Sequence, residues 1–169
     1  MRYVRFAAVA ALSLLAACAD HYGAFNPAQQ GKSEQHLTPA RWSVTMTGSS
    51  IEFARQAALY RGAVLLAAGG YSQVQIVSLQ SEGIDWKGFY NNLPLGTKHI
   101  RTITAQFVGA QDAAPPAQCE SSIRNTKYCQ TLPVAEVLAT VGPALGRTAA
   151  QTDAEIAAAK KSPRPPLYP

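Results

Sequence analysis

The chain has few of the residues that build common catalytic and metal centres. It contains three cysteines and three histidines among 169 residues. The histidines (His21, His36 and His99) are scattered, and no carboxylates cluster, so the sequence indicates neither a metal site nor a bound cofactor. It has no G-x-S-x-G nucleophile elbow. Gly69-Gly70 ends a predicted helix and does not begin one, which argues against a phosphate-binding loop. We therefore do not expect an enzyme.

A serine–histidine–aspartate set can still be drawn from His99, Asp85 and either Ser72 or Ser78. No motif positions these residues relative to one another, and any chain of this length offers such triplets by chance. A hydrolase is therefore the least favoured of the functions that we consider.

The chain also lacks an apolar run that could cross a bilayer as a helix, which takes about 20 residues. Its N-terminal apolar stretch, Phe6–Leu15, is shorter than that and is broken by Ser13. Arg2 and Arg5 flank its start, as in the positive region of a secretory signal peptide. Residues 1–17 are therefore predicted to be a signal peptide.

The segment Leu15-Ala16-Ala17-Cys18 resembles the lipobox of bacterial lipoproteins. The resemblance implies cleavage before Cys18, a diacylglycerol thioether on its thiol, and acylation of the new N-terminus. More than one long chain makes membrane anchoring stable. Ala19 follows the cysteine where an aspartate would signal inner-membrane retention, which favours the outer membrane. The alternative is an ordinary cleaved signal with a coincidental cysteine.

The charge of the chain is low and unpatterned. Fifteen Lys and Arg stand against ten Asp and Glu, a net charge of +5. Removing residues 1–17 takes away Arg2 and Arg5, which leaves 13 basic against 10 acidic residues, or +3. A secreted protein is separated from the nucleic acids of the cell, so we do not expect nucleic acid as a partner. A weak attraction to anionic headgroups or acidic envelope polymers is one interpretation of this charge, and ordinary solubility is the other.

If Cys18 carries lipid, Cys119 and Cys129 remain. An even number of cysteines in an oxidising compartment predicts one structural disulfide. The loop that it closes is short, and the chain-entropy model gives about 3 kcal/mol for it. Two thiols without a nearby histidine make zinc the weaker alternative, and their spacing excludes a redox Cys-x-x-Cys motif.

Composition divides the remaining chain into three parts. Residues 18–39 have few large apolar groups and are predicted to be the lipidated N-terminus and a tether. Residues 40–145 are predicted to form a single α+β domain. Residues 146–169 are helix-prone and then rich in proline, which is typical of an extended tail.

Within the domain, hydrophobic periodicity predicts a strand-helix-strand-strand core with a short C-terminal helix. Ser49 and Glu52 have the spacing of a capping box, and Gly69-Gly70 would end the helix that it starts at about Ala68. Consecutive strand, helix and strand imply parallel pairing through a right-handed crossover, whereas the third strand can pair antiparallel. The predicted strands are 41–47, 71–79 and 99–108, and the predicted C-terminal helices are 135–141 and 153–161.

The predicted long helix carries a charge in an unusual place. Arg61 falls in the middle of its broad apolar face, so it must be paired or reach water. Glu82 and Asp85 are candidate partners, and Arg61 is either a structural clamp or a ligand-gripping group. Leu59 and Leu66 fall on the far side of the helix, where a docked C-terminal segment could cover them.

The segment 80–98 is predicted to be a long loop. Long irregular connections are often functional, and aromatic residues on them suit binding. The alternative is that its apolar residues fold back and cover the open face of the sheet. Our candidate binding surface consists of Trp86, Phe89, Tyr90 and Arg61.

The first half of the chain resembles a family of small proteobacterial lipoproteins of unknown function. The resemblance covers residues 18–77, and Gly62 departs from it where a stronger helix former is expected. It implies lipidation and an α+β domain, and it implies no activity. The matching positions are Trp42, Val44, Met46, Gly48, Arg61, Ala63, Gly70, Tyr71 and Val74.

Together these patterns predict a non-enzymatic lipoprotein of the bacterial envelope, anchored to the membrane by its N-terminal lipid and facing the periplasm. We expect it to tether or support a protein assembly through an envelope protein partner. The alternative is a module that binds a small ligand or an envelope polymer.

Overall fold

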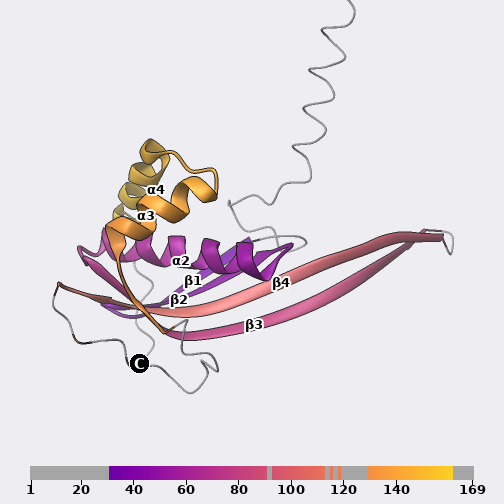
Figure 1. Ribbon diagram of the computed structural model, residues 1–169, viewed down its shortest axis with the longest axis horizontal. Helices are drawn as coiled ribbons and strands as arrows, with labels where there is room; N and C mark the ends of the chain where they lie inside the picture. Colours follow the sequence, from indigo (N-terminus) through magenta and orange to yellow (C-terminus); the bar gives the residue numbers. More distant parts are fainter. Residues whose placement is uncertain (1–30, 91–92, 113–114, 116–117, 119–128, 162–169) are drawn as a thin grey trace, which may run out of the picture.

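The computed structural model describes residues 31–90, 93–112, 115, 118 and 129–161. These residues form one small α+β domain, as the sequence predicts, with a single sheet and helices on one of its faces (Figure 1). The strands are β1 (Gly31–Thr38), β2 (Arg41–Gly48), β3 (Gln73–Tyr90), β4 (Leu93–Ala110) and β5 (Thr131–Pro133). The helices are α2 (Ile51–Ala68), α3 (Val134–Ala144) and α4 (Ala149–Lys161).

The sheet has the strand order β1-β2-β4-β3-β5, and every neighbouring pair is antiparallel. Because β2 and β3 both run antiparallel to β4, they are parallel to each other, but β4 lies between them. The expectation that the strands before and after the helix pair directly is therefore wrong. The third strand does pair antiparallel, as expected. Its pairing with β3 is local in sequence, and local pairing closes a shorter loop than a crossover does.

Helix α2 is the middle layer of the domain. One side packs on β2 and β4, and α3 and α4 pack on its other side (Figure 1). This position explains why its C-terminal half is buried almost all round, including Leu66, which the sequence placed on the outer side. The C-terminal helices thus cover the far side of α2.

The ends of α2 follow the expected chemistry, with a shift of one residue at the start. Ser50 is the N-cap, and its side-chain oxygen accepts a hydrogen bond from the Phe53 amide at 3.1 Å. The N-cap is thus Ser50 and not the expected Ser49. The residue three positions after Ser50 is Phe53, so the capping box expected from Ser49 and Glu52 is not the cap of this helix. At the other end Gly70 has φ +82°, the left-handed conformation that glycine adopts without steric cost.

Gly62 lets α2 approach the sheet closely. A Cβ at this position would stand 2.6 Å from a ring carbon of Phe107 on β4, well inside van der Waals contact. Phe107 is fully buried in the core. The weak helix former at position 62 is thus explained by close packing of the helix on the sheet.

Strand β1 occupies residues that the sequence assigned to the tether, so that assignment is wrong for 31–38. The strand is polar, and only alternate residues face α2, which gives no hydrophobic run. One of them, His36, is 7% exposed and lies 4.4 Å, ring to ring, from Trp42. Neither nitrogen of the His36 ring has a hydrogen-bond partner among the residues that the structure describes. Pairing with β2, and not its own composition, makes this segment a strand.

Both predicted C-terminal helices are present, and each is longer than expected. Helix α4 is fixed to α2 by a buried hydrogen bond of 2.9 Å between the Tyr60 hydroxyl and Thr152 Oγ1. The expected domain boundary at residue 145 lies between α3 and α4. Since both helices pack on α2, this position does not separate the domain from a tail. Residues 162–169 lie outside the described part of the chain.

Candidate functional site

The most prominent feature of the molecule is a two-stranded arm. Strands β3 and β4 each run for 18 residues, and β2 pairs with β4 only as far as Arg101. Beyond that point, residues 84–90 and 93–100 pair with each other alone and project from the domain (Figure 1). We call these residues the arm. At about 3.4 Å per residue it extends roughly 25 Å past the sheet.

The arm corrects our expectation for residues 80–98. These residues are not a loop, and they do not fold back over the sheet, because 80–90 belong to β3 and 93–98 to β4. Trp86, Phe89 and Tyr90 are therefore strand residues. The placement of their side chains lies outside what the structure describes.

Both long edges of the arm carry backbone groups without a neighbouring strand in the described part of the chain. On the β3 side, β5 pairs only with residues 73–75. A two-stranded ribbon is marginally stable in water, and an unpaired edge is a template for another strand. Ile84 lies at the start of the arm and is 64% exposed. The arm thus offers both backbone hydrogen-bonding groups and apolar surface.

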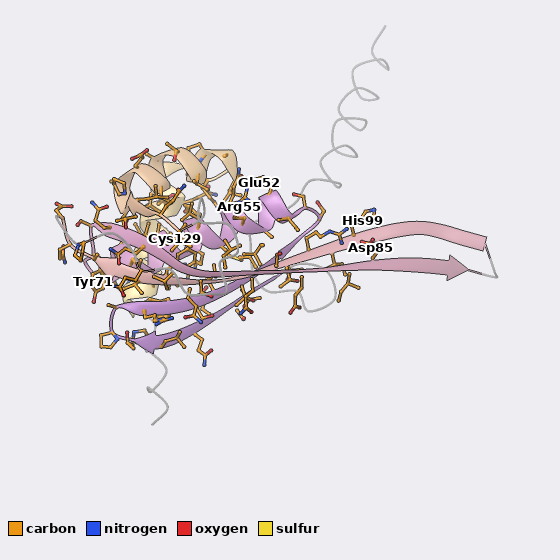
Figure 2. The ribbon with its side chains drawn as sticks, turned by 60° about the horizontal axis from the view of Figure 1, so that its bottom comes forward. Glu52, Arg55, Tyr71, Asp85, His99 and Cys129 are labelled. Atoms are coloured by element: carbon orange, nitrogen blue, oxygen red, sulfur yellow. The ribbon has the colours of Figure 1, made fainter. Side chains whose placement is uncertain are left out.

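Three polar side chains gather at the base of the arm. His99 Nδ1 lies 2.9 Å from Asp85 Oδ1, and Figure 2 shows the two side chains together on the arm. The Arg101 Nη1 donates to the same carboxylate oxygen at 2.7 Å. Hydrogen bonds from His99 and then Arg101 hold the pKa of Asp85 below its usual value. The cluster joins the two strands at the base of the arm. Because its side chains are largely exposed, these ion pairs contribute little to the stability of the arm.

The serines of the possible catalytic set are not part of this cluster. Ser72 donates to Asp112 Oδ1 at 2.9 Å, at the opposite end of β3. Ser78 is 3% exposed within β3. The structure thus brings together His99 and Asp85 but gives them neither serine as a nucleophile.

Arg61 forms a buried ion pair, with partners other than those expected. Its Nε and Nη2 donate to Glu34 Oε1 and Oε2 at 2.7 and 2.9 Å, a two-pronged contact with β1. Its Nη1 lies 3.9 Å from Glu155 of α4. Glu82 and Asp85 are not its partners in these contacts, because both lie on β3, on the far side of β2 and β4. Arg61 is thus a structural clamp between α2, β1 and α4.

The two halves of the expected binding surface are consequently far apart in the fold. Arg61 contacts β1, which is one edge of the sheet. The three aromatic residues belong to the part of β3 that forms the arm, and β2 and β4 separate β3 from β1 in the sheet: Trp86, Phe89 and Tyr90. No single site contains them all.

Two hollows were not anticipated from the sequence. One, of about 290 Å³, lies between α2 and strands β3 to β5. The other, of about 420 Å³, lies between α3 and α4. Of the residues that line the first, the sequence analysis singled out Glu52, as part of a capping box, and Leu59, as an apolar residue on the outer side of the helix. That signal is shared by many surface leucines, so it could not have located a cavity.

The remaining expectations concern the cysteines, metal binding and membrane-spanning helices. Cys18 and Cys119 lie outside the described residues, and Cys129 is half-buried just before β5. Among the described residues there is no group of three or more metal-binding side chains. In the same part of the chain, no helix combines the length and the apolar character needed to traverse a bilayer.

The fold and the arm define this protein as a small α+β domain that presents a β-hairpin far from its core. No protein-family model, curated protein or solved structure matches the chain.

Proposed function

We propose that this protein is a lipid-anchored adaptor of the bacterial envelope whose arm holds a partner protein. The observation that carries this proposal is the arm itself, a hairpin that leaves the domain with both backbone edges unpaired among the described strands. Such edges bind extended segments of other proteins by adding a strand. The partner is therefore an envelope protein that presents an extended segment.

The anchor rests on the lipobox resemblance at Cys18. Lipidation there and retention at the outer membrane, favoured by Ala19, would place the domain on the periplasmic side of a membrane. Replacing Cys18 with alanine tests this directly. The variant is expected to leave the membrane fraction on cell fractionation, and an unchanged membrane fraction would contradict the anchor.

The partner is tested by in-cell crosslinking from two matched positions. Ile84 on the arm and Ile51 at the start of α2 are both large, apolar and exposed, at 64% and 41%. A photo-crosslinking residue at position 84 is expected to capture one dominant protein, identified by mass spectrometry. The same residue at position 51 is the control. Equal adducts from both positions, or none from position 84, would overturn the proposal.

A shortened arm gives an independent test. Gly83 and Arg101 are register partners, so an Asn-Gly turn can join them in place of residues 84–100. The core lies outside the removed segment, so the variant is expected to keep its unfolding temperature and lose the partner. Retention of the partner by this folded variant would exclude the arm as the binding surface.

We also propose the Cys119–Cys129 disulfide as part of this envelope form. Cys129 directly precedes Gln130, whose carbonyl oxygen accepts a hydrogen bond from the Ile76 amide at 2.9 Å. One end of the bridge would thus be held against β3. Mass spectrometry without reduction is expected to recover a linked peptide pair, and two free thiols in periplasmic protein would refute it.

A further inference from the structure

The hollow beside α2 lies between the helix and strands β3 to β5, and most of the residues that line it are apolar. Its walls come from the helix, from two long strands and from the short strand β5, which places it within the folded domain and away from the arm. The apolar lining residues are Leu59, Ile76, Leu79, Ala105, Phe107 and Leu132. Ala105 and Phe107 are fully buried at its floor, whereas Leu59, Leu79 and Leu132 are half-buried.

The topology explains why the hollow exists. Helix α2 packs over β2 and β4, and the glycine at position 62 seats it directly on Phe107. The helix therefore leaves part of β3 without a covering element. Strand β5 is only three residues long, and the chain then leaves the sheet to form α3 against α2. The space between these elements therefore follows from the position of α2 over β2 and β4 and from the short length of β5.

The rim of the hollow is polar but carries no net charge. Glu52 pairs with Arg55 and accepts a hydrogen bond from Gln56 Nε2 at 3.1 Å. Figure 2 shows Glu52 and Arg55 on α2. Gln130 is the other polar lining residue. A ligand that fits this arrangement has an apolar body and a small polar end, and it needs no strong charge of either sign.

We infer that this hollow binds a single acyl or alkyl chain with a small uncharged polar head. A volume of about 290 Å³ is at the lower end of ligand cavities, which excludes large multi-ring compounds. Ligand pockets are typically lined by aliphatic and aromatic side chains with a few polar groups, and the lining of this hollow has that composition. The same chemistry is found in a free fatty alcohol or ester and in the chain of a lipid.

The test is a titration of the purified full chain, in detergent-free buffer, with straight-chain primary alcohols of increasing length. Binding is read from displacement of the neutral fluorophore N-phenyl-1-naphthylamine. Burial of each further methylene is expected to tighten binding about fourfold, until the chain fills the hollow and the gain stops. Absence of saturable displacement, or affinity that does not depend on chain length, would overturn the inference.

Matched variants locate the site. Leu79→Trp on β3 and Leu59→Trp on α2 each fill the hollow from a half-buried position and are expected to weaken alcohol binding at least tenfold. Leu138→Trp makes the same change in the hollow between α3 and α4, where Leu138 is also half-buried, and should leave binding unchanged. Using two blocking variants guards against one that fails to fold, which circular dichroism will show.

Binding that survives in both folded blocking variants, or that is lost only in Leu138→Trp, would overturn the assignment to this hollow. The source of the natural chain is then distinguished by native mass spectrometry of protein taken from cells. A bound mass of a single-chain compound indicates a free alcohol or ester, and that of a diacyl compound indicates a membrane lipid. An empty protein that still binds alcohols supports the site with an exchangeable ligand.

Discussion

The ion pair between Arg61 and Glu34 allows a quantitative test of how the domain is held together. Arg61 is 8% exposed, and its guanidinium forms salt bridges with Glu34 and Glu155. Changing Glu34 to glutamine keeps the shape of the side chain and removes the charge. The guanidinium would then remain buried, with a neutral group in place of its nearest counter-ion.

The expected cost follows from the burial of both partners. Breaking a buried ion pair by removing one charge costs about 3–5 kcal/mol. The Glu34 side chain is 20% exposed and Glu155 remains at 3.9 Å, so we expect a value of about 3 kcal/mol. For a domain of this size, that lowers the unfolding midpoint by on the order of 10 °C.

The assay is chemical and thermal unfolding followed by circular dichroism, with two comparisons. Glu52→Gln breaks the exposed pair with Arg55 and should change stability by less than about 1 kcal/mol. Adding Arg61→Met to the Glu34→Gln variant removes the stranded charge and should restore part of the loss, so the two changes are non-additive. A Glu34→Gln variant as stable as the wild type would refute the clamp, and so would strict additivity.

Three further outcomes follow from the structure. Gly62→Ala should destabilise the protein in thermal unfolding by about 1–3 kcal/mol despite its better helix propensity, since the new methyl would stand 2.6 Å from a buried phenylalanine ring. Burial raises the pKa of Tyr60, so the folded state keeps the phenol proton where the unfolded chain loses it. Stability should therefore fall as the pH rises above about 10, and Tyr60→Phe should weaken this fall in unfolding measured across alkaline pH. Arg101→Gln should raise the pKa of Asp85 toward its ordinary value in a carboxyl NMR titration, and an unchanged value would show that Arg101 does not contact it in solution.

The arm and the hollow lie on different parts of the molecule, which separates the two proposals experimentally. The shortened arm removes residues 84–100, and none of these lines the hollow. That variant should therefore still bind alcohols while losing the partner. Conversely, Leu59→Trp should lose alcohol binding and retain the partner.

The elements of the domain body could be largely predicted from the sequence, because they depend on local patterns. Alternation in 41–47 predicted β2, and apolar spacing with terminal glycines predicted α2 to its last residue. Arg61 was recognised as a charge that needs a partner. Its actual partner, Glu34, could not be chosen, since it lies in a polar segment that shows no periodicity until β2 pairs with it.

The arm was missed for a related reason. Residues 80–98 contain glycines and aromatic residues with no clean alternation, which is typical of a loop. Strand β3 also has an irregularity between Ile76 and Ser78, which breaks the period of two that a pattern search requires. Backbone pairing between the two halves of a hairpin made these residues strands. That pairing depends on no side-chain signal that can be read along the chain.

The sequence by itself determined the helices, the central strands, the need to pair Arg61, and the expectation of a lipid on Cys18, because these depend on neighbours in the chain. Only the tertiary structure decided the strand order, the clamp on β1, the arm and the hollow beside α2. The strand order, the clamp and the hollow arise where backbone or side chains from distant segments meet, and the arm arises from backbone pairing that its side-chain pattern does not indicate. The free energy of such contacts depends on which segments are adjacent in space, and that information is not local in the sequence.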